Sequence, residues 1–292
     1  MAKYLGSHVS MKAPRYYVDS ILESLHNGAN TLMLYTGAPQ NAKRIPLEEL
    51  HIEEALELAK EHQLDSHHFI VHAPYIINLA NPLETEKVEM GKRFLLTELE
   101  RTEKMGISTL VLHPGSHKGA GEKAGLDTLI SSLNDVLAID PTHVTIALET
   151  MAGKGFEVGR TLDELAYVYQ HIIKKDRIGF CLDTCHLSDG GYDLTNTQQF
   201  LALVDEKLGL ENIKVVHLND SKNPIGSHKD RHENVGFGQI GFDTLYRLYC
   251  APELEEVPFI LETPFVNEKS PYEKEISMLH LGVFDEEMKE KL

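Results

Sequence analysis

The sequence of 292 residues predicts an α/β fold, in which a single (β/α)8 barrel of the TIM type spans residues 1–292. Short runs rich in Val, Ile and Leu alternate eight times with amphipathic helical stretches, as expected for parallel strands buried on both faces. No linker or low-complexity segment divides the chain. Several apolar runs end in His, Asp or Glu, and a barrel gathers the carboxyl ends of its strands at one rim.

The predicted strands are short and apolar, which suits strands that lie between a barrel interior and a surrounding layer of helices. In chain order they are Tyr4–Ser10, Thr31–Thr36, Phe69–Tyr75, Thr109–Ser116, Thr145–Met151, Ile178–Asp183, Lys214–Asp220 and Pro258–Thr263.

The predicted helices lie between these strands and carry an apolar face with a period near 3.6 residues. In the first helix, for example, Val18, Ile21 and Leu25 share one face. Residues Asp285–Leu292 are expected to form a solvated helical tail. In chain order the helices are Arg15–His26, Leu47–His62, Glu86–Met105, Gly125–Ala138, Thr161–Ile173, Thr197–Leu208, Phe242–Cys250 and Pro271–Leu279.

Composition and charge narrow the function class. The N-terminus lacks an apolar segment and no run approaches membrane-spanning length, so neither a signal peptide nor a membrane partner is predicted. Three cysteines, an odd number, favour reduced thiols and a cytoplasmic protein. The net charge of −17 argues against a protein that coats nucleic acid, because such proteins neutralise phosphate with Lys and Arg. Any nucleic-acid role therefore requires a local positive site.

Six predicted strand ends carry side chains of the kind that bind metals. One such residue is usually structural, but six at one rim are difficult to explain as coincidence, and buried carboxylates without a partner are costly. We therefore predict a metal site at this rim. The six residues are His72, His113, Glu149, Asp183, His217 and Glu262.

Three further candidate ligands, His186, Asp230 and His232, lie in loops beyond the strands. One zinc ion takes about four ligands, so these nine side chains are too many for a single ion and three ions are expected. Five of the nine are imidazoles, which favours Zn²⁺ over Mg²⁺. Occupation of part of the sites by Mn²⁺ is an alternative.

Other residues near the rim have more than one interpretation. Cys181 and Cys185 are expected not to bind metal, because Cys-x-x-x-Cys is a weak zinc spacing and Cys181 lies in an apolar strand. His8, on the first strand, either supports a ligand or is structural. The glycine-rich stretch 233–241 either lets a phosphate approach backbone N–H groups or forms a simple tight turn.

Longer motifs surround these positions. They are Leu-Gly-Ser-His-Val-Ser at 5–10, His-Ala-Pro-Tyr-Ile-Ile-Asn-Leu at 72–79, Leu-His-Pro-Gly-Ser-His at 112–117, Leu-Glu-Thr-Met-Ala-Gly at 148–153, Leu-Asp-Thr-Cys-His at 182–186, His-Leu-Asn-Asp-Ser-Lys at 217–222, Asp-Arg-His-Glu-Asn-Val-Gly at 230–236 and Leu-Glu-Thr-Pro at 261–264. In this combination the chain resembles, nearly from end to end, the endonuclease IV family of apurinic/apyrimidinic (AP) endonucleases.

The resemblance implies an activity and a cofactor. The expected activity is hydrolysis of the phosphodiester bond 5′ to an abasic site in double-stranded DNA, which leaves a 3′-hydroxyl and a 5′-deoxyribose phosphate, together with removal of blocking groups from 3′ ends. The expected protein is a monomer that acts at the nucleoid. Glu149 and Glu262 are the expected catalytic carboxylates, since they help to hold the metals that activate water. Three zinc ions per chain would be held by His72, His113 and Glu149, by Glu149, Asp183, His217 and Glu262, and by His186, Asp230 and His232.

The same resemblance suggests residues that contact DNA. Some family members insert an arginine and a tyrosine into the DNA stack at the lesion. Tyr75 matches the tyrosine, whereas Gln40 stands where the arginine would be. An abasic sugar has no base to unstack, so turning it into a pocket costs least at the lesion. The basic residues expected around the site are Lys43, Arg44, Lys222, Lys229 and Arg231.

Two other classes of function fit part of the pattern. A sugar isomerase or epimerase on the same type of barrel also places Glu, Asp and His at strand ends, around one or two divalent metals, but does not need Asp230 and His232. A metal-buffering or DNA-binding module is the non-enzymatic alternative. Open coordination positions on several zinc ions argue against it.

Overall fold

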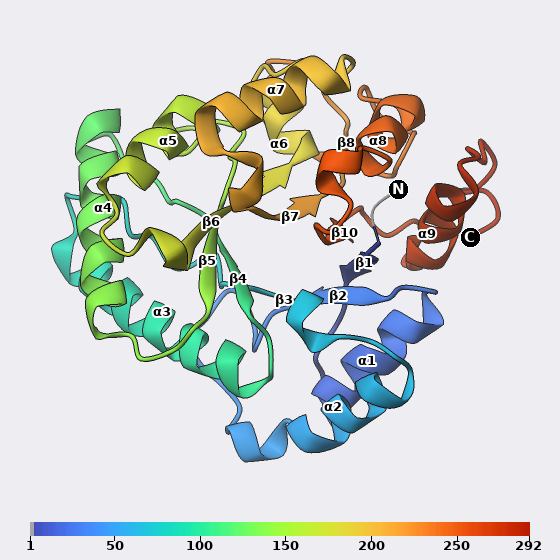
Figure 1. Cartoon of the computed structure of the whole chain (residues 1–292), viewed down its shortest axis with the longest axis horizontal. Helices are drawn as coiled ribbons and strands as arrows, with labels where there is room; N and C mark the ends of the chain where they lie inside the picture. Colours follow the sequence, from blue (N-terminus) through green and yellow to red (C-terminus); the bar gives the residue numbers. More distant parts are fainter. Residues whose placement is uncertain (1–2) are drawn as a thin grey trace.

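The computed structural model describes residues 3–292. Eight parallel strands pair in a closed ring, and the helices surround them (Figure 1). Each of the eight predicted strands is present, and pairing of the first two closes the barrel. In the order of their hydrogen bonding the strands are β1 (Leu5–His8), β10 (Phe259–Leu261), β7 (Ile213–His217), β6 (Ile178–Asp183), β5 (Thr145–Glu149), β4 (Thr109–Leu112), β3 (Ile70–His72) and β2 (Thr31–Leu34).

The helices follow the predicted pattern with two differences. The predicted helix Leu47–His62 is divided into a 3₁₀ turn and α2, because His51 between them adopts a left-handed conformation with φ of 55°. The short α6 was not predicted, because it begins directly at the end of a strand. The helices are α1 (Tyr17–His26), α2 (Ile52–Glu61), α3 (Thr85–Lys104), α4 (Glu122–Ile139), α5 (Leu162–His171), α6 (Thr184–Asp189), α7 (Thr197–Leu208), α8 (Phe242–Tyr249) and α9 (Tyr272–Leu281), and the 3₁₀ turns are Leu47–Glu49, Ser66–His68, Lys175–Arg177, Leu210–Asn212 and Pro252–Leu254.

An apolar layer fills the barrel interior and places the candidate ligands. Its members come from seven different strands and are Met33, Ile70, Val111, Ala147, Cys181, Val215 and Ile260. Side chains two residues apart on a strand face the same side. The next inward position is therefore His72 on β3, Glu149 on β5 and His217 on β7. The alternation of the strands thus directs the candidate ligands into one layer above the apolar one.

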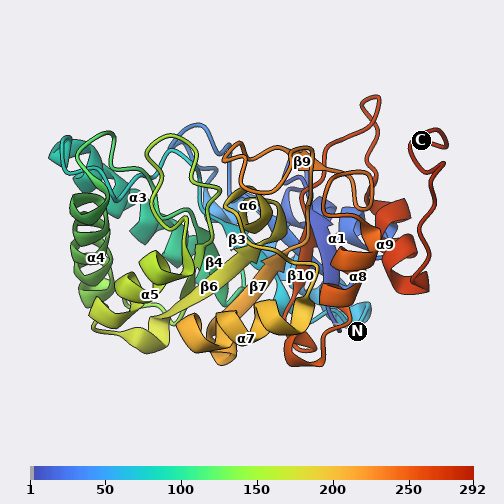
Figure 2. The same ribbon diagram turned by 90° about the horizontal axis from the view of Figure 1, so that it is seen from above.

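The loops that follow the strands form the rim above this layer. Figure 2 shows them along its upper edge, with α6 and β9 among them and the N-terminus at the lower edge. A two-stranded antiparallel pair, β8 (Asp220–Ser221) with β9 (His232–Glu233), frames the loop after β7. Within residues 3–292, none of the helices has the length and apolar character needed to cross a membrane.

The C-terminal tail differs from the prediction. Residues 285–292 form turns rather than a helix, and Met288 is fully buried. Lys289 Nζ lies 2.6 Å from the Glu233 carboxylate and 4.8 Å from the centre of the Phe237 ring. The prediction of a solvated helical tail is wrong because Met288 is buried in the core and the ion pair of Lys289 with Glu233 ties the tail to β9.

The glycine-rich stretch 233–241 is a tight turn around a buried carboxylate. Asp220 accepts hydrogen bonds from the backbone N–H groups of Gly236 (3.1 Å), Gly238 (3.0 Å), Ile240 (2.9 Å) and Gly241 (3.2 Å). These amides already bind an internal anion, so the interpretation of the stretch as a phosphate cradle is wrong.

Candidate metal centre

Glu149 lies at the centre of the cluster, and its two carboxylate oxygens face different imidazoles. Oε2 lies 3.3 Å from His72 Nε2 and 3.0 Å from His113 Nε2. Oε1 lies 3.0 Å from His217 Nδ1 and 3.4 Å from His186 Nδ1. The side chain of Glu149 is buried, and such a carboxylate requires compensating positive charge on both of its sides.

A second group of donors shares Glu149. His217 Nδ1 lies 3.0 Å from Glu262 Oε2 and 3.9 Å from Asp183 Oδ2. One ligand atom from each of these four residues lies within 4.8 Å of the others. Three carboxylates in such close proximity repel one another, and a cation among them would remove the repulsion.

His186, Asp230 and His232 form a third group beside the second. Only Asp230 lies in a loop, because His186 is on α6 and His232 is on β9, so the prediction that all three lie in loops is wrong for two of them. One ligand atom from each of Asp183, His186 and His232 lies within 4.8 Å of the others. Asp230 Oδ1 lies 3.0 Å from His186 Nε2 and 3.5 Å from His232 Nε2. Asp183 Oδ2 lies 3.7 Å from His232 Nε2, so Asp183 stands between the second and third groups. His232 Nε2 is buried and has no hydrogen-bond partner among residues 3–292, which is consistent with a nitrogen that binds a cation.

Hydrogen bonds on the outer side of the cluster fix which imidazole nitrogen carries the proton. A carbonyl oxygen only accepts, so an Nδ1 that contacts one carries the proton and leaves the Nε2 lone pair for the cluster. Such contacts join His72 to Ala73 O (2.7 Å), His186 to Thr150 O (2.9 Å) and His232 to Glu262 O (3.2 Å).

The ionisation of the cluster reflects its crowded charges. Burial alone would lower the pKa of His186, but the negative charge of Asp183 and the hydrogen bond to Asp230 outweigh burial, so the pKa is raised well above its usual value. Burial alone would raise the pKa of Glu149, but His217 and His113 hold it well below its usual value. Protons thus occupy positions that a cation would take, and metal binding would release them.

All nine predicted ligands are therefore brought together in three connected groups. Four carboxylates and five imidazoles, with one ring nitrogen of each imidazole facing a carboxylate of the cluster, are the donor set that zinc and similar divalent ions take. The clusters could hold metal ions.

The two cysteines lie close to the cluster. Cys181 Sγ lies within 4.8 Å of ligand atoms of Glu149 and His217, but Cys181 belongs to the apolar layer of the barrel. Burial raises the pKa of its thiol to about 12, which disfavours the thiolate that binds metals. Cys185, near Asp230 and His232, also has a raised pKa because it is buried.

The sequence interpretation missed Asn219. Its Nδ2 donates to Asp183 Oδ2 over 2.7 Å, and its Oδ1 accepts from the backbone N–H of Glu262 over 2.8 Å. Asn219 is fully buried and ties the carboxyl end of β6 to that of β10. Its position two residues after His217 was the available signal, because the alternation of a strand directs both side chains inward.

Tyr35 was also missed, and it connects His8 to the cluster. The Tyr35 ring centre lies 5.1 Å from that of His8 and 5.1 Å from that of His72. His8 therefore packs behind the ring that contacts a candidate ligand. Burial raises the pKa of Tyr35, and the negative charges of Glu262 and Glu149 raise it further, so the phenol stays protonated.

The predicted DNA-contact residues lie in loops that follow the strands. Tyr75 follows β3 and is 55% exposed, so its ring is available to a partner. Gln40 and Lys43 are exposed in the loop after β2, and Arg231 is exposed beside β9. Arg44 is different, because its side chain is only 8% exposed.

Arg44 is part of the fold rather than of the basic rim. Its Nε donates to Glu98 Oε1 over 2.5 Å, and its Nη1 donates to the carbonyl oxygens of Asn41 (2.9 Å) and Lys43 (3.0 Å). The prediction that Arg44 contacts DNA is therefore wrong, since the guanidinium is used inside the loop after β2.

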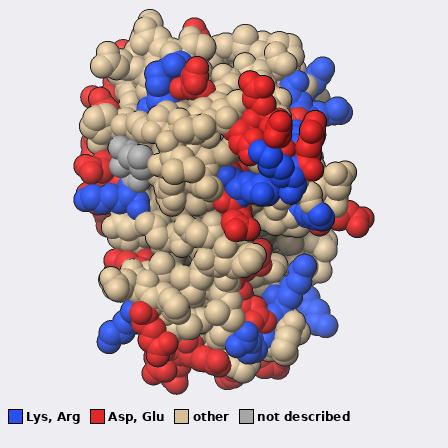
Figure 3. Space-filling view, turned by 90° about the vertical axis from the view of Figure 1, so that its right-hand side faces the viewer, with Lys and Arg blue, Asp and Glu red and all other residues tan. Residues whose placement is uncertain are grey.

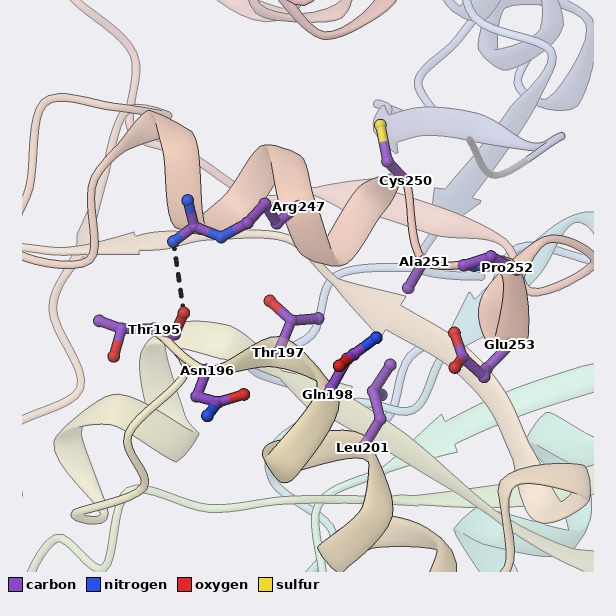
Figure 4. A pocket seen from close by; sticks show the side chains of 10 residues that line it. All are labelled: Thr195, Asn196, Thr197, Gln198, Leu201, Arg247, Cys250, Ala251, Pro252 and Glu253. Atoms are coloured by element: carbon purple, nitrogen blue, oxygen red, sulfur yellow. Dashed lines mark hydrogen bonds between the residues drawn. The ribbon is translucent and has the colours of Figure 1, made fainter.

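Among residues 3–292, every group of His, Cys, Asp and Glu side chains that could hold a metal ion lies at this rim. On the face in Figure 3, basic and acidic groups lie next to one another. A groove of about 620 Å³ between α7 and α8 is lined by none of the nine candidate ligands. In Figure 4 the Arg247 guanidinium points across this groove to the carbonyl oxygen of Thr195, at 3.4 Å.

Comparison with known proteins places the chain in a family. Residues 23–280 match the sequence model of a family described as a xylose isomerase-like TIM barrel. The probable endonuclease 4 of Oceanobacillus iheyensis is 48% identical over 99% of this chain and 98% of its own length. That of Geobacillus kaustophilus is 49% identical over 99% of this chain and 97% of its own length. The chain belongs to the endonuclease IV family.

Solved structures agree with this assignment. The crystal structure of endonuclease IV from Thermus thermophilus matches with a TM-score of 0.82 and 27% identity, over 95% of this chain and 98% of that one. A D-tagatose 3-epimerase-like protein matches with a TM-score of 0.70 and 17% identity, over 95% of this chain and 96% of that one. At that identity the second likeness shows a shared barrel and not a shared reaction.

Proposed function

We propose that this member of the endonuclease IV family is a metal-dependent DNA-repair nuclease. It hydrolyses the phosphodiester bond 5′ to an abasic site, leaving a 3′-hydroxyl and a 5′-deoxyribose phosphate, and removes blocking groups from 3′ ends. The observation that carries the proposal is the position of Glu149, whose two oxygens join two groups of donors, with a third group beside them. Relatives of this chain named probable endonuclease 4 support it.

The proposed cofactor is three zinc ions per chain, with Mn²⁺ in part of the sites as an alternative. His72, His113 and Glu149 would hold one ion, with Glu149 shared by a second group of Asp183, His217 and Glu262. His186, Asp230 and His232 would hold the third. Such ions supply Lewis-acid activation of water and stabilise charge on phosphate oxygens.

The chain's own residues would orient the substrate and hold the metal ligands in position. Glu262 has a side chain that is 18% exposed, whereas those of Glu149 and Asp183 are closed to solvent, so Glu262 borders the space that a phosphodiester would enter. Asn219 holds Asp183 and Glu262 in position through its amide. We assign Glu149 and Glu262 as the catalytic carboxylates.

DNA would approach the rim rather than the whole surface. The net charge of −17 repels DNA at long range, so attraction must come from loaded metal sites and nearby basic side chains. Lys43 and Arg231 are exposed in rim loops, and Tyr75 offers a ring for stacking. Gln40 is neutral and stands where some family members have the arginine that they insert into the DNA stack.

The test combines metal analysis with a cleavage assay. Purified protein is analysed for bound metal and incubated with a duplex that contains one abasic site, with end labels that identify the cleaved bond and its termini. Three zinc ions per chain and a single cut 5′ to the lesion are expected. Cleavage should stop with a chelator and return with zinc.

Glu262→Gln provides the matched variant. Because it keeps the size of the side chain but removes its charge, abasic-duplex binding should persist while turnover falls by at least a hundredfold. An intact abasic duplex with wild-type protein that carries three zinc ions would refute the proposed activity, and near wild-type turnover of the variant would refute the role of Glu262.

A further inference from the structure

Lys154 contacts a candidate metal ligand from the outer side. Its Nζ lies 3.0 Å from Asp230 Oδ2, while Oδ1 of the same carboxylate faces His186 Nε2 at 3.0 Å. The two oxygens of Asp230 are thus divided between an ammonium and the third group of donors. The ion pair also joins two loops that are far apart in the sequence, one after β5 and one between β8 and β9.

The loop that carries Lys154 has a defined conformation. Gly153 and Gly155, on either side of Lys154, have φ of 80° and 62°, a region that side chains other than glycine rarely adopt. The backbone N–H of Lys154 donates to Glu157 Oε2 over 2.8 Å. The carbonyl oxygen of Ala152 lies 2.7 Å from Nδ1 of His228, which belongs to the Asp230 loop. The fold therefore determines where the ammonium lies.

The ammonium group keeps unused hydrogen-bonding capacity. An ammonium has three donors, and Asp230 accepts one of them. The next carboxylate oxygen, Glu157 Oε1, lies 4.0 Å away, which is beyond a hydrogen bond. The side chain is 54% exposed, so an incoming group can reach it.

We infer that Lys154 is a phosphate-binding residue of the active site, whose ammonium contacts a non-bridging oxygen of the DNA phosphate beside the third group of donors while it positions Asp230. The inference rests on the proposed function, because it takes DNA as the ligand. When a cation occupies the third group, that cation compensates the charge of Asp230, and the charge of Lys154 becomes available to phosphate. Lysine suits this contact as a point charge with rotatable donors.

The experiment measures binding and metal content as well as cleavage. Binding is titrated in the Glu262→Gln background with the abasic duplex over a series of salt concentrations. Lys154→Met should weaken binding about tenfold and make the slope of log K against log salt shallower by about one, because one phosphate contact is lost. Cleavage by Lys154→Met in the otherwise wild-type chain should fall at least tenfold in kcat/KM, with three ions still bound.

Two further variants separate charge from geometry. Lys154→Arg should recover most of the binding and the salt slope, whereas Lys154→Gln, which still donates to Asp230 but carries no charge, should not. Lys123→Met is the control, because Lys123 also pairs with an aspartate, Asp127, at 2.7 Å, but lies on the outer helix α4. Lys123→Met should leave the affinity for the abasic duplex, the salt slope and kcat/KM unchanged.

Two results would overturn the inference. One is an unchanged salt slope in Lys154→Met, and the other is loss of the third ion with full recovery by Lys154→Gln, which would mean that Lys154 only positions Asp230. A wild-type protein that leaves the abasic duplex intact would instead count against the proposed function, and the salt slope would still report whether Lys154 contacts phosphate.

Discussion

The backbone N–H of Asp230 donates a hydrogen bond to the carboxylate of Asp189 over 2.8 Å. Asp189 is fully buried at the end of α6, three residues after His186. Its carboxylate also accepts from Ser221 Oγ over 2.6 Å and from Asn223 Nδ2 over 3.3 Å. Asp230 itself has a left-handed backbone with φ of 54°. Asp189 therefore holds a strained loop residue against the helix that supplies another candidate ligand.

Replacing Asp189 with Asn should weaken the third metal site selectively. The amide keeps the size of the side chain but has one accepting oxygen in place of two, so it cannot accept from Ser221, Asn223 and the N–H of Asp230 together, and the anchor of the loop is weakened. We expect about tenfold weaker binding of one ion, with the other two retained, as measured by metal content during dialysis against a graded chelator. Asp193→Asn is the control, because Asp193 is exposed and lies outside the cluster. Equal metal content in both variants would contradict the assignment.

Glu149 and His186 should differ in how many ions they control. Glu149→Ala removes the carboxylate that faces two groups of donors, so two ions should be lost together. His186→Ala removes an imidazole whose Nε2 faces Asp230, so mainly the third ion should be lost. Metal stoichiometry of the two purified variants measures this difference. Equal losses from both would refute the division of ligands among three ions.

Much of the site was accessible from sequence because strand periodicity determines it. His72, Glu149 and His217 each end a strand two positions after a residue of the apolar layer, and that spacing is visible in the sequence. The eight strands could be predicted because each is a short apolar run between amphipathic helical stretches. The tail was mispredicted because Met288 joins the hydrophobic core and Lys289 pairs with the distant Glu233, which local sequence does not reveal.

Contacts between residues distant in the sequence explain the other differences between the predictions and the structure. Arg44 has the sequence character of a surface cation, and only the fold brings Glu98 of α3 beside it. The stretch 233–241 has the composition of a phosphate loop, but Asp220 occupies its amides. In both cases the partner lies outside the local segment, 54 residues from Arg44 and 16 or more from the glycine-rich amides, so local composition carries no information about it.

Tyr75 should contribute more to lesion recognition than Gln40. Tyr75 is 55% exposed after β3, and an aromatic ring that stacks on an unsupported base step contributes about 1–3 kcal/mol. Tyr75→Ala should therefore weaken abasic-duplex binding about tenfold or more, whereas Gln40→Ala should change it only slightly. Titrations with matched abasic and intact duplexes at one salt concentration measure both effects. Ile173→Ala, 82% exposed after α5, is the control. If Tyr75→Ala loses affinity equally for the abasic and the intact duplex, Tyr75 has no role in recognising the lesion.

Glu275 should make the protein less stable as the pH rises above about 5. Burial on α9 raises the pKa of its carboxyl from 4.5 to about 7, against hydrogen bonds from Thr263 and from the N–H of Val235 (2.9 Å) and the more distant charge of Lys289. The folded protein therefore holds a proton that the unfolded chain releases between these two pH values. The stability that this proton contributes is complete below pH 4.5 and is lost as the pH rises through 7.

Glu275→Gln mimics the protonated carboxyl and should remove this dependence. From pH 5 to pH 8 the free energy of unfolding of the wild type should fall relative to the variant by on the order of 2 kcal/mol. Urea unfolding in the presence of a chelator measures the difference, because contributions of the metal ligands then cancel between the two proteins. Glu273→Gln, at an exposed position of the same helix, should follow the wild type. Parallel curves for wild type and Glu275→Gln would show that Glu275 is ionised in the folded protein throughout this range.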